Sequence, residues 1–231
     1  MVEDKQKEWL MYLNRVAVPL DYTMQVCYRV NQPRIPLPQV YKFPIGHRVI
    51  FPNELVLETD RDSYEENKDF AEIIFEILKE LNIPFVFGFS GNKSFHFHVF
   101  MDWRIEIKSE KFEKLKEKGF EFYMARNKIA ELLFNLIREQ EYDIFGNSKL
   151  DYANLYRNSL IREFGGKHEG TSYYKSSLKR IPSFRPQIAD YKFVSMPERI
   201  ELWSCLENLE HAIRYWRPNK KKQYKQAFSH G

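Results

Sequence analysis

The sequence has few cysteines and no long apolar run. Its two cysteines, Cys27 and Cys205, lie far apart and form no C-x-x-C pair. Cysteine alone therefore supplies neither a zinc ribbon nor a dithiol redox motif, and a reducing, cytoplasmic setting is the simplest expectation. The charged segment from Met1 to Lys7 leads into no apolar signal region, and no run of about 18 apolar residues occurs. We therefore expect a protein that is neither secreted nor membrane-spanning.

A strong net charge is also missing, and the formal value of +4 says little by itself about a polyanionic partner. The distribution of charge says more, because cations and aromatic residues are interleaved near the end of the sequence. That pattern suits phosphate contact together with base stacking, but a solvated tail has the same composition, and both interpretations stay open. The basic candidates for nucleic-acid binding are Arg214, Arg217, Lys220, Lys221, Lys222 and Lys225, with Tyr215, Trp216 and Tyr224 among them.

What is present is the composition of a globular protein, with 43% hydrophobic, 29% charged and 16% aromatic residues. A chain of 231 residues builds one large domain, or a core with a small appendage, without a disulfide framework. We expect a core domain over residues 1–195. A C-terminal helix and a basic tail are expected over residues 196–231, packed on the core or trailing from it.

The expected elements follow the order strand, helix, strand, strand, which predicts an α/β or α+β fold with mixed sheets flanked by helices. Ser63 and Glu66 form a capping-box pattern before a helix with apolar residues from Phe70 to Leu81. The other expected elements are a helix at 8–16, a strand at 23–30, one bent strand or a hairpin over 49–57, strands at 85–89 and 95–101, a surface helix at 105–118, a long amphipathic helix at 122–137, a turn-like stretch at 143–149 and a final helix at 197–215.

Two carboxylates end a strand-like run in Leu55-Val56-Leu57-Glu58-Thr59-Asp60. Because side chains alternate along a strand, Glu58 and Asp60 share one face at its exposed end, close enough to share a metal ion. Magnesium or manganese would relieve the repulsion between the two anions and also bind triphosphate oxygens, as in two-metal nucleotidyl transfer. A solvated strand end, where acids are common, is the alternative interpretation.

A small polar turn joins two apolar strands in residues 89–99. The backbone N–H groups and polar side chains of such a turn can cradle phosphate, and histidines at alternate positions project from one strand face. The candidates are Ser90, Gly91, Lys93, His96 and His98. The two imidazoles can instead ligate one zinc ion together with Asp102 or Asp60. In a third interpretation one histidine is buried and hydrogen-bonded, and the turn is only a hairpin.

A third polar group begins at Asp151, which ends a short apolar run. An acid followed closely by arginines, a lysine and a histidine supplies a third metal ligand and more charge for binding phosphate. A charged surface loop with glycines would have the same composition. The residues are Asp151, Arg157, Arg162, Lys167 and His168, with Gly165 and Gly166 at a turn.

These three groups, in this order, resemble motifs I, II and III of the catalytic subunits of the archaeo-eukaryotic primase superfamily. Family members typically show an Asp-x-Asp pair, a Ser-Gly-x-x-Gly-x-His turn, and a third Asp upstream of an Ile-Arg and a Gly-x-x-His segment. The corresponding pieces here are Glu58-Thr59-Asp60, the turn from Ser90 to His96, and Asp151 followed by Ile161-Arg162 and Gly165 to His168. The resemblance spans Leu55 to Lys175, about half of the 231 residues.

The resemblance implies a primase-type catalytic core and a template-dependent nucleotidyltransferase, a DNA primase or primase-polymerase that uses NTPs or dNTPs. It implies two Mg²⁺ or Mn²⁺ ions. Many primase small subunits also carry a zinc-binding module, but two isolated cysteines cannot supply the usual one, so no structural zinc is expected. The implied partners are a DNA template and primer, nucleoside triphosphates, and a helicase or large-subunit-like protein. By the same resemblance the metals are held by Glu58, Asp60 and Asp151, and the incoming triphosphate is contacted by Ser90, Gly91, Lys93, His96, Arg162 and His168.

Two positions depart from the family pattern. Glu58 stands where aspartate is usual, and Ser94 replaces a glycine and so puts a Cβ into the turn. These departures leave open a non-catalytic nucleic-acid-binding subunit of the same fold. A metal-dependent phosphoesterase or nuclease built on His96, His98 and Asp60 is the other alternative.

Overall fold

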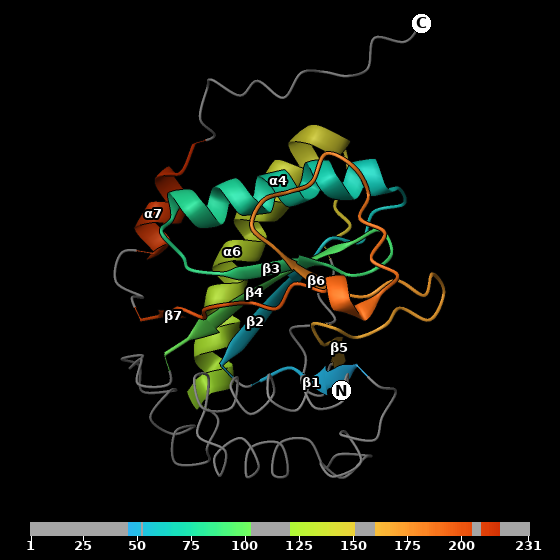
Figure 1. The fold of residues 1–231 in the computed structure, drawn as a ribbon. Helices are drawn as coiled ribbons and strands as arrows, with labels where there is room; N and C mark the ends of the chain where they lie inside the picture. The colour runs from blue at the N-terminus through green and yellow to red at the C-terminus, as the bar shows by residue number, and fades with distance from the viewer. Residues whose placement is uncertain (1–45, 52, 103–120, 151–159, 205–208, 218–231) are drawn as a thin grey trace, which may run out of the picture.

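The computed structural model describes residues 46–51, 53–102, 121–150, 160–204 and 209–217, which form mixed sheets flanked by helices. The strands are mostly antiparallel, and the helices lie together on one side of them, so the predicted α+β class is confirmed. Figure 1 shows one long helix above the strands, a second long helix that runs downward past them, and a separate pair of short strands below.

Within the residues that the structure describes, the main sheet has five strands and a second sheet has two. In the main sheet the order is β2 (Glu54–Glu58), β4 (Phe95–Met101), β3 (Val86–Phe89) and β6 (Ser176–Leu178), all antiparallel, with β7 (Leu202–Trp203) parallel to β4. The second sheet pairs β1 (His47–Val49) with β5 (Leu160–Arg162) in antiparallel fashion. Segments far apart in the sequence therefore meet around β4, the central strand of the main sheet.

Helix α4 (Tyr64–Glu80) begins at the predicted capping box. The side chain of Ser63 accepts a hydrogen bond from the backbone N–H of Glu66 at 3.1 Å, and the Glu66 side chain accepts one from the Ser63 N–H. These two bonds satisfy donors that a helix N-terminus otherwise leaves unpaired. The helix then presents a buried stripe that includes Phe70, Ile74 and Leu78 to the sheet, as its periodicity predicts.

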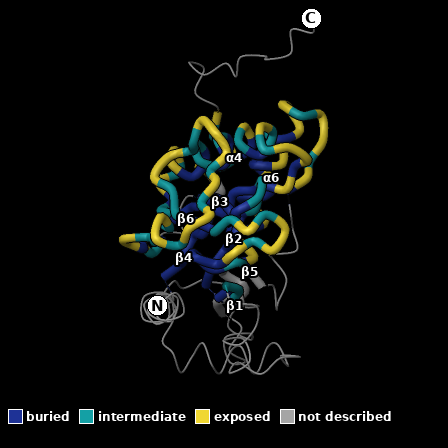
Figure 2. The backbone as a smooth tube through the Cα atoms, turned by 45° about the vertical axis from the view of Figure 1, so that its right-hand side comes forward, coloured by how far each residue is buried: buried dark blue, intermediate teal, exposed yellow. Residues whose placement is uncertain are grey.

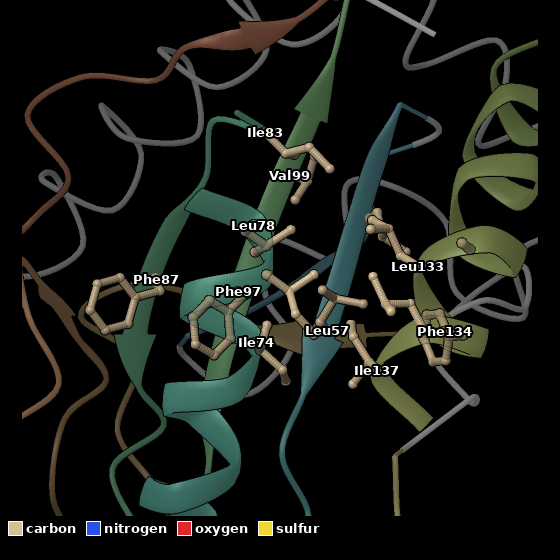
Figure 3. Packing of buried hydrophobic residues seen from close by; sticks show 14 of the residues in the cluster. Leu57, Ile74, Leu78, Ile83, Phe87, Phe97, Val99, Leu133, Phe134 and Ile137 are labelled. Atoms are coloured by element: carbon tan, nitrogen blue, oxygen red, sulfur yellow. The ribbon is translucent and has the colours of Figure 1, made fainter. Parts of the chain in front are cut away.

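The apolar core lies between the sheet and two helices, α4 and α6 (Glu121–Phe145). Figure 3 shows Leu57 of β2 and Phe97 of β4 pointing toward these helices, and both side chains are fully buried. From α6, Leu133, Phe134 and Ile137 pack against the same face. The predicted helix at 122–137 and the strands at 85–89 and 95–101 are confirmed, although α6 runs on to Phe145 into the stretch predicted to be turn-like.

The opposite face of the main sheet carries ionisable side chains among apolar ones such as Val56 and Phe100, and it is also covered. Every residue of β4 is buried, so the even-numbered side chains His96 and His98 lie inside the protein on the face away from the helices. Figure 2 shows the strands as largely buried, whereas exposed backbone lies in the loops and on the outer sides of the helices.

The prediction of one bent strand or a hairpin over residues 49–57 is wrong. The two apolar runs there belong to different sheets, since β1 pairs with β5 and β2 pairs with β4. A short buried turn separates them, in which the backbone N–H of Glu54 donates to the carbonyl of Phe51 at 3.0 Å. Strand pairing between distant segments decided the arrangement, and local sequence carries no signal for it.

The final helix predicted from Pro197 to Tyr215 is only partly present. Leu202 and Trp203 form β7, which pairs with Phe100 and Met101 at the end of β4, and α7 covers Leu209–Tyr215. The pairing of β3 with β4 ends at His98, so the end of β4 offers backbone hydrogen bonds to a passing segment, and this outweighs the helical spacing of the apolar residues. Trp203 and Leu209 then join the same apolar core as α4 and α6.

Several predictions fall outside the described residues. These are the helix at 8–16, the strand at 23–30, the surface helix at 105–118, Asp151, Arg157 and the basic residues Lys220, Lys221, Lys222 and Lys225. Of the basic tail candidates, Arg214 and Arg217 are described, and both are exposed. No helix in the described ranges is long and apolar enough to cross a membrane.

Candidate functional site

The register of the main sheet places four ionisable side chains on its polar face. Glu58 lies opposite His96, and Val56 lies opposite His98, in the antiparallel pairing of β2 with β4. Because side chains alternate along a strand, Glu54 and Glu58 of β2 share the face that carries both histidines. This face runs from the buried Glu54 to Glu58, whose side chain is 23% exposed at the strand end.

The two predicted metal ligands sit at the end of β2, each beside a cationic or histidine partner. Glu58 Oε1 lies 3.1 Å from His96 Nε2, and Asp60 Oδ1 lies 3.4 Å from Lys93 Nζ. Between them Thr59 is buried and pairs with Phe95, whose backbone N–H donates to the threonine hydroxyl at 2.9 Å. Thr59 therefore holds the end of β2, so that its two acidic neighbours meet the turn that carries Lys93.

A buried arginine anchors the chain directly after Asp60. The Arg61 guanidinium donates to Glu141 of α6 at 2.6 Å and lies over the ring of Phe145 at 3.9 Å from its centroid. The backbone carbonyl of Arg61 accepts a hydrogen bond from Lys93 Nζ at 2.7 Å. Lys93 thus bridges Asp60 to the main chain, and α6 helps to fix the position of both residues.

The turn from Ser90 to Ser94 is closed by its own hydrogen bonds. The Ser90 N–H donates to the Ser94 carbonyl at 2.9 Å, and the Ser94 hydroxyl donates to the Ser90 hydroxyl at the same distance. Gly91 has a φ of +97°, and a Cβ there would lie 2.8 Å from the Tyr173 carbonyl oxygen. The turn therefore requires glycine at position 91. At position 94 it accepts a serine, whose hydroxyl forms one of the hydrogen bonds that close the turn.

The end of β5 and the segment that follows it pack directly on this turn. Arg162 Nη1 donates to the Ser90 carbonyl at 2.9 Å, and the Thr171 hydroxyl donates to the Gly91 carbonyl at 2.6 Å. His168 lies beside Gly91, because a Cβ on that glycine would approach the His168 Cβ to 3.1 Å. The structure thus brings Ser90, Gly91, Arg162 and His168 together, next to the end of the sheet that carries Glu58 and His96.

A chain of buried charges extends from Glu58 into the protein. Arg48 is paired with Glu54 through Nη2 and Oε1 at 2.7 Å, and its Nε is 2.9 Å from Glu163 Oε2. Glu54 Oε1 also lies 2.7 Å from His98 Nδ1. The ammonium of Lys175 completes the chain, since its Nζ is 2.9 Å from His98 Nε2 and 3.1 Å from His96 Nδ1. We refer to these residues, namely Arg48, Glu54, His96, His98, Glu163 and Lys175, as the buried ionic network.

Burial dominates the acid–base behaviour of this network. It lowers the pKa of His98 to about 3, helped by the nearby Lys175 charge. Burial and Arg48 lower the pKa of Lys175 to about 7 in spite of Glu163 and Glu54. For Glu54, burial acts to raise the pKa, but the Arg48 guanidinium outweighs it and holds that pKa well below its usual range. The network therefore keeps Glu54 ionised and His98 neutral.

These shifts predict that stability increases with pH. His98 in the unfolded chain takes up a proton near its ordinary value of 6.5, and Lys175 near 10.5, whereas the folded protein binds these protons only below about 3 and about 7. The unfolded state therefore holds more protons between about pH 3 and 6.5, through His98, and between about pH 7 and 10.5, through Lys175. The free energy of unfolding rises with pH across both ranges, by on the order of a few kcal/mol. Melting temperatures measured from about pH 4 to pH 9 should rise. A maximum on the acid side of this range would contradict the prediction.

A comparison with protein-family models, with curated proteins and with solved structures finds no match for this chain. The functional conclusion therefore depends on the geometry of the site.

The donor set at the end of β2 fits a hard divalent cation. Glu58 and Asp60 supply carboxylate oxygens of the kind that Mg²⁺ and Mn²⁺ prefer, and both side chains reach solvent, with 23% and 60% exposed. Within the described ranges no group of three or more His, Cys, Asp or Glu side chains could hold an ion. The third predicted donor, Asp151, lies outside those ranges.

A zinc ion shared by the two histidines has no room in this arrangement. The ring nitrogens that would converge on such an ion, His96 Nδ1 and His98 Nε2, both face Lys175 Nζ at hydrogen-bond distance. An ammonium group occupies the position between them. The other nitrogen of His98 is held by Glu54. This geometry gives no support to the alternative of a metal-dependent phosphoesterase built on the two histidines.

Sequence reasoning missed the interior half of this site. Glu54 had a usable signal, because it precedes Glu58 by four residues and so shares its strand face. Lys175 had none, since it follows two tyrosines in a polar stretch and reaches the histidines only because β6 pairs with β3. Arg48 and Glu163 were likewise brought in by the pairing of β1 with β5.

Proposed function

We propose that the chain is a template-dependent nucleotidyltransferase of the archaeo-eukaryotic primase type, a primase or primase-polymerase. The observation that supports the proposal is the convergence of three separate segments on one end of the main sheet. The end of β2 brings two carboxylates, and the turn after β3 brings Ser90 and Lys93. The end of β5 brings Arg162, and the segment that follows it brings His168. Anionic and cationic groups side by side suit a metal-bound triphosphate.

In the proposed reaction a 3′ hydroxyl attacks the α-phosphate in line, the bond to the β-phosphate breaks, and pyrophosphate leaves. Glu58 and Asp60, with Asp151, would hold Mg²⁺ or Mn²⁺, which would neutralise phosphate charge and favour the attacking alkoxide. The residues Lys93, Arg162 and His168 would bind the triphosphate oxygens and orient the leaving group. The contribution of the protein is mainly positioning and charge neutralisation, which suits this chemistry.

The groups that would bind phosphate are held in place before any ligand arrives. Arg162 is fixed to the Ser90 carbonyl, and His168 has its backbone N–H bonded to the Tyr173 carbonyl at 2.7 Å. His96 is 3% exposed, and its Nε2 lies 3.1 Å from Glu58 Oε1. A phosphate oxygen entering beside Glu58 would give this nitrogen a second acceptor.

The test is a strand-extension assay. Purified protein is incubated with a single-stranded template, with or without a primer, and with labelled NTPs or dNTPs in Mg²⁺ or Mn²⁺. Extended or newly primed products are expected in at least one combination, and chelation of the metal should abolish them. Folded protein that gives no product in any combination, yet binds DNA, would support the non-catalytic subunit instead. Metal-dependent degradation of the labelled strand would support a nuclease.

A further inference from the structure

Lys175 is fully buried and is surrounded by hydrogen-bond acceptors. Its side chain is 0% exposed, and its Nζ makes three contacts at hydrogen-bond distance. These contacts are the backbone carbonyl of Arg162 at 2.8 Å, His98 Nε2 at 2.9 Å and His96 Nδ1 at 3.1 Å. A buried ammonium is costly unless it is fully hydrogen-bonded, so the arrangement of these three partners matters.

Counting hydrogens defines the state of both imidazoles. An ammonium group has three N–H donors and no acceptor, and Lys175 has three partners. The Arg162 carbonyl can only accept. Each histidine nitrogen that faces Lys175 must therefore also accept, through a lone pair. A hydrogen on either nitrogen would collide with a hydrogen of the ammonium.

The other nitrogen of each ring must then carry the hydrogen. For His98 this is Nδ1, which donates to Glu54 Oε1 at 2.7 Å, so the carboxylate and the ammonium favour the same tautomer. For His96 it is Nε2, which lies 3.1 Å from Glu58 Oε1 at the edge of the candidate phosphate site. The hydrogen of His96 thus points toward the place where a triphosphate would bind.

We propose that Lys175 is a positioning residue for nucleotide binding, whose ammonium holds His96 in the tautomer that presents an N–H to a phosphate oxygen. The inference rests on the proposed function of the site. Without Lys175, His96 is free to carry its hydrogen on Nδ1, and the lone pair of Nε2 would then repel both Glu58 and phosphate. Lys175 does not touch the ligand, and acts through His96.

The first test uses the unaltered protein. Long-range ¹H–¹⁵N spectra report which imidazole nitrogen carries the hydrogen, and are recorded near pH 6.5, where Lys175, with a pKa of about 7, is largely protonated. Neutral rings are expected, with the hydrogen on Nε2 of His96 and on Nδ1 of His98. A hydrogen on Nδ1 of His96 would overturn the inference without any variant being made.

The second test compares Lys175→Met with Lys179→Met. Lys179 is a matched control because it directly follows β6, as Lys175 directly precedes it, and its side chain is 84% exposed and pairs with Glu198 on the surface. In Lys175→Met, His96 is expected to show a mixture of tautomers while His98 keeps its hydrogen on Nδ1. The dissociation constant for magnesium tripolyphosphate should rise about tenfold, as expected for the loss of one hydrogen bond to a charged group. Lys179→Met should match the unaltered protein in both measurements.

The outcomes separate this inference from the proposed function. If Lys175→Met is folded and keeps both the His96 tautomer and the affinity for tripolyphosphate, Lys175 has no positioning role. If the unaltered protein shows the expected tautomers but does not bind tripolyphosphate, the proposed nucleotide site is wrong, and the proposed role of Lys175 in nucleotide binding is overturned with it. Circular dichroism shows whether each variant is folded. If Lys175→Met is unfolded, the His96 tautomer in the ¹H–¹⁵N spectra of the unaltered protein decides whether the inference stands.

Discussion

Asp60→Asn is expected to lower nucleotide incorporation by about a hundredfold or more, because an amide removes one charge from the carboxylate pair that would hold the metal. Asp60 is well placed for this role, since 60% of its side chain is exposed and its neighbour Thr59 is fixed in the sheet. The measurement is the rate of primer extension at saturating Mg²⁺ or Mn²⁺. Folding should be preserved, because the only ionic partner that Asp60 has among the described residues is the part-exposed Lys93.

Asp62→Asn provides the matched control for that experiment. Asp62 lies two residues further along, its side chain is 80% exposed, and it pairs with Lys149 outside the candidate site. Loss of this surface pair should change incorporation less than about twofold, because exposed ion pairs contribute little. Equal losses in the two variants, or full activity in Asp60→Asn, would contradict the assignment of Asp60 as a metal ligand.

Glu54→Gln is expected to be the most destabilising single change in the buried ionic network, with a loss of about 3–5 kcal/mol in the free energy of unfolding. Glu54 is 0% exposed and contacts Arg48 and His98 at 2.7 Å each. Its removal leaves the Arg48 guanidinium buried with Glu163 as its remaining carboxylate partner. Urea denaturation of the variant and the unaltered protein measures the difference.

Glu198→Gln is the control for the Glu54 experiment. Glu198 pairs with Lys179 on the surface, where 79% of its side chain is exposed, and its replacement should change stability by less than about 0.5 kcal/mol. The double variant Arg48→Met with Glu54→Leu should lose less than the sum of the two single changes, because it leaves neither Arg48 nor Glu54 as a buried charge deprived of the other. Glu163 loses its contact with Arg48 in both the single and the double variant, so this loss does not enter the comparison. Additive losses would show that the two residues do not act as a pair.

The buried ionic network gives the candidate site a rigid support. Its members come from β1, β2, β4, the end of β5 and the residue before β6, so the network joins the two sheets. One close approach of two glycines closes the same region, because a Cβ on Gly166 would lie 2.4 Å from the Gly46 carbonyl oxygen. A site supported in this way can present His96 and Arg162 with little loss of conformational entropy when a ligand binds.

Capping residues and the spacing of apolar residues predicted the helices and strands that depend on neighbouring residues in the sequence. The Ser63 and Glu66 capping box, the stripe of α4 and the two strands around the polar turn are all present. The residue types of the candidate site were also identifiable, because Glu58, Asp60 and His96 stand at alternate positions next to turns. The structure places Glu58 beside His96 and Asp60 beside Lys93, but it does not describe Asp151.

The sequence by itself determined the α+β class, the main helices and the kinds of side chain available at the end of β2. Only the tertiary structure decided that β1 leaves β2 to pair with β5, that Leu202 and Trp203 form a strand, and that Lys175 lies between the two histidines. The physical reason is that helix periodicity and capping act over a few neighbouring residues, whereas strand pairing and the burial of charge join segments far apart in the chain.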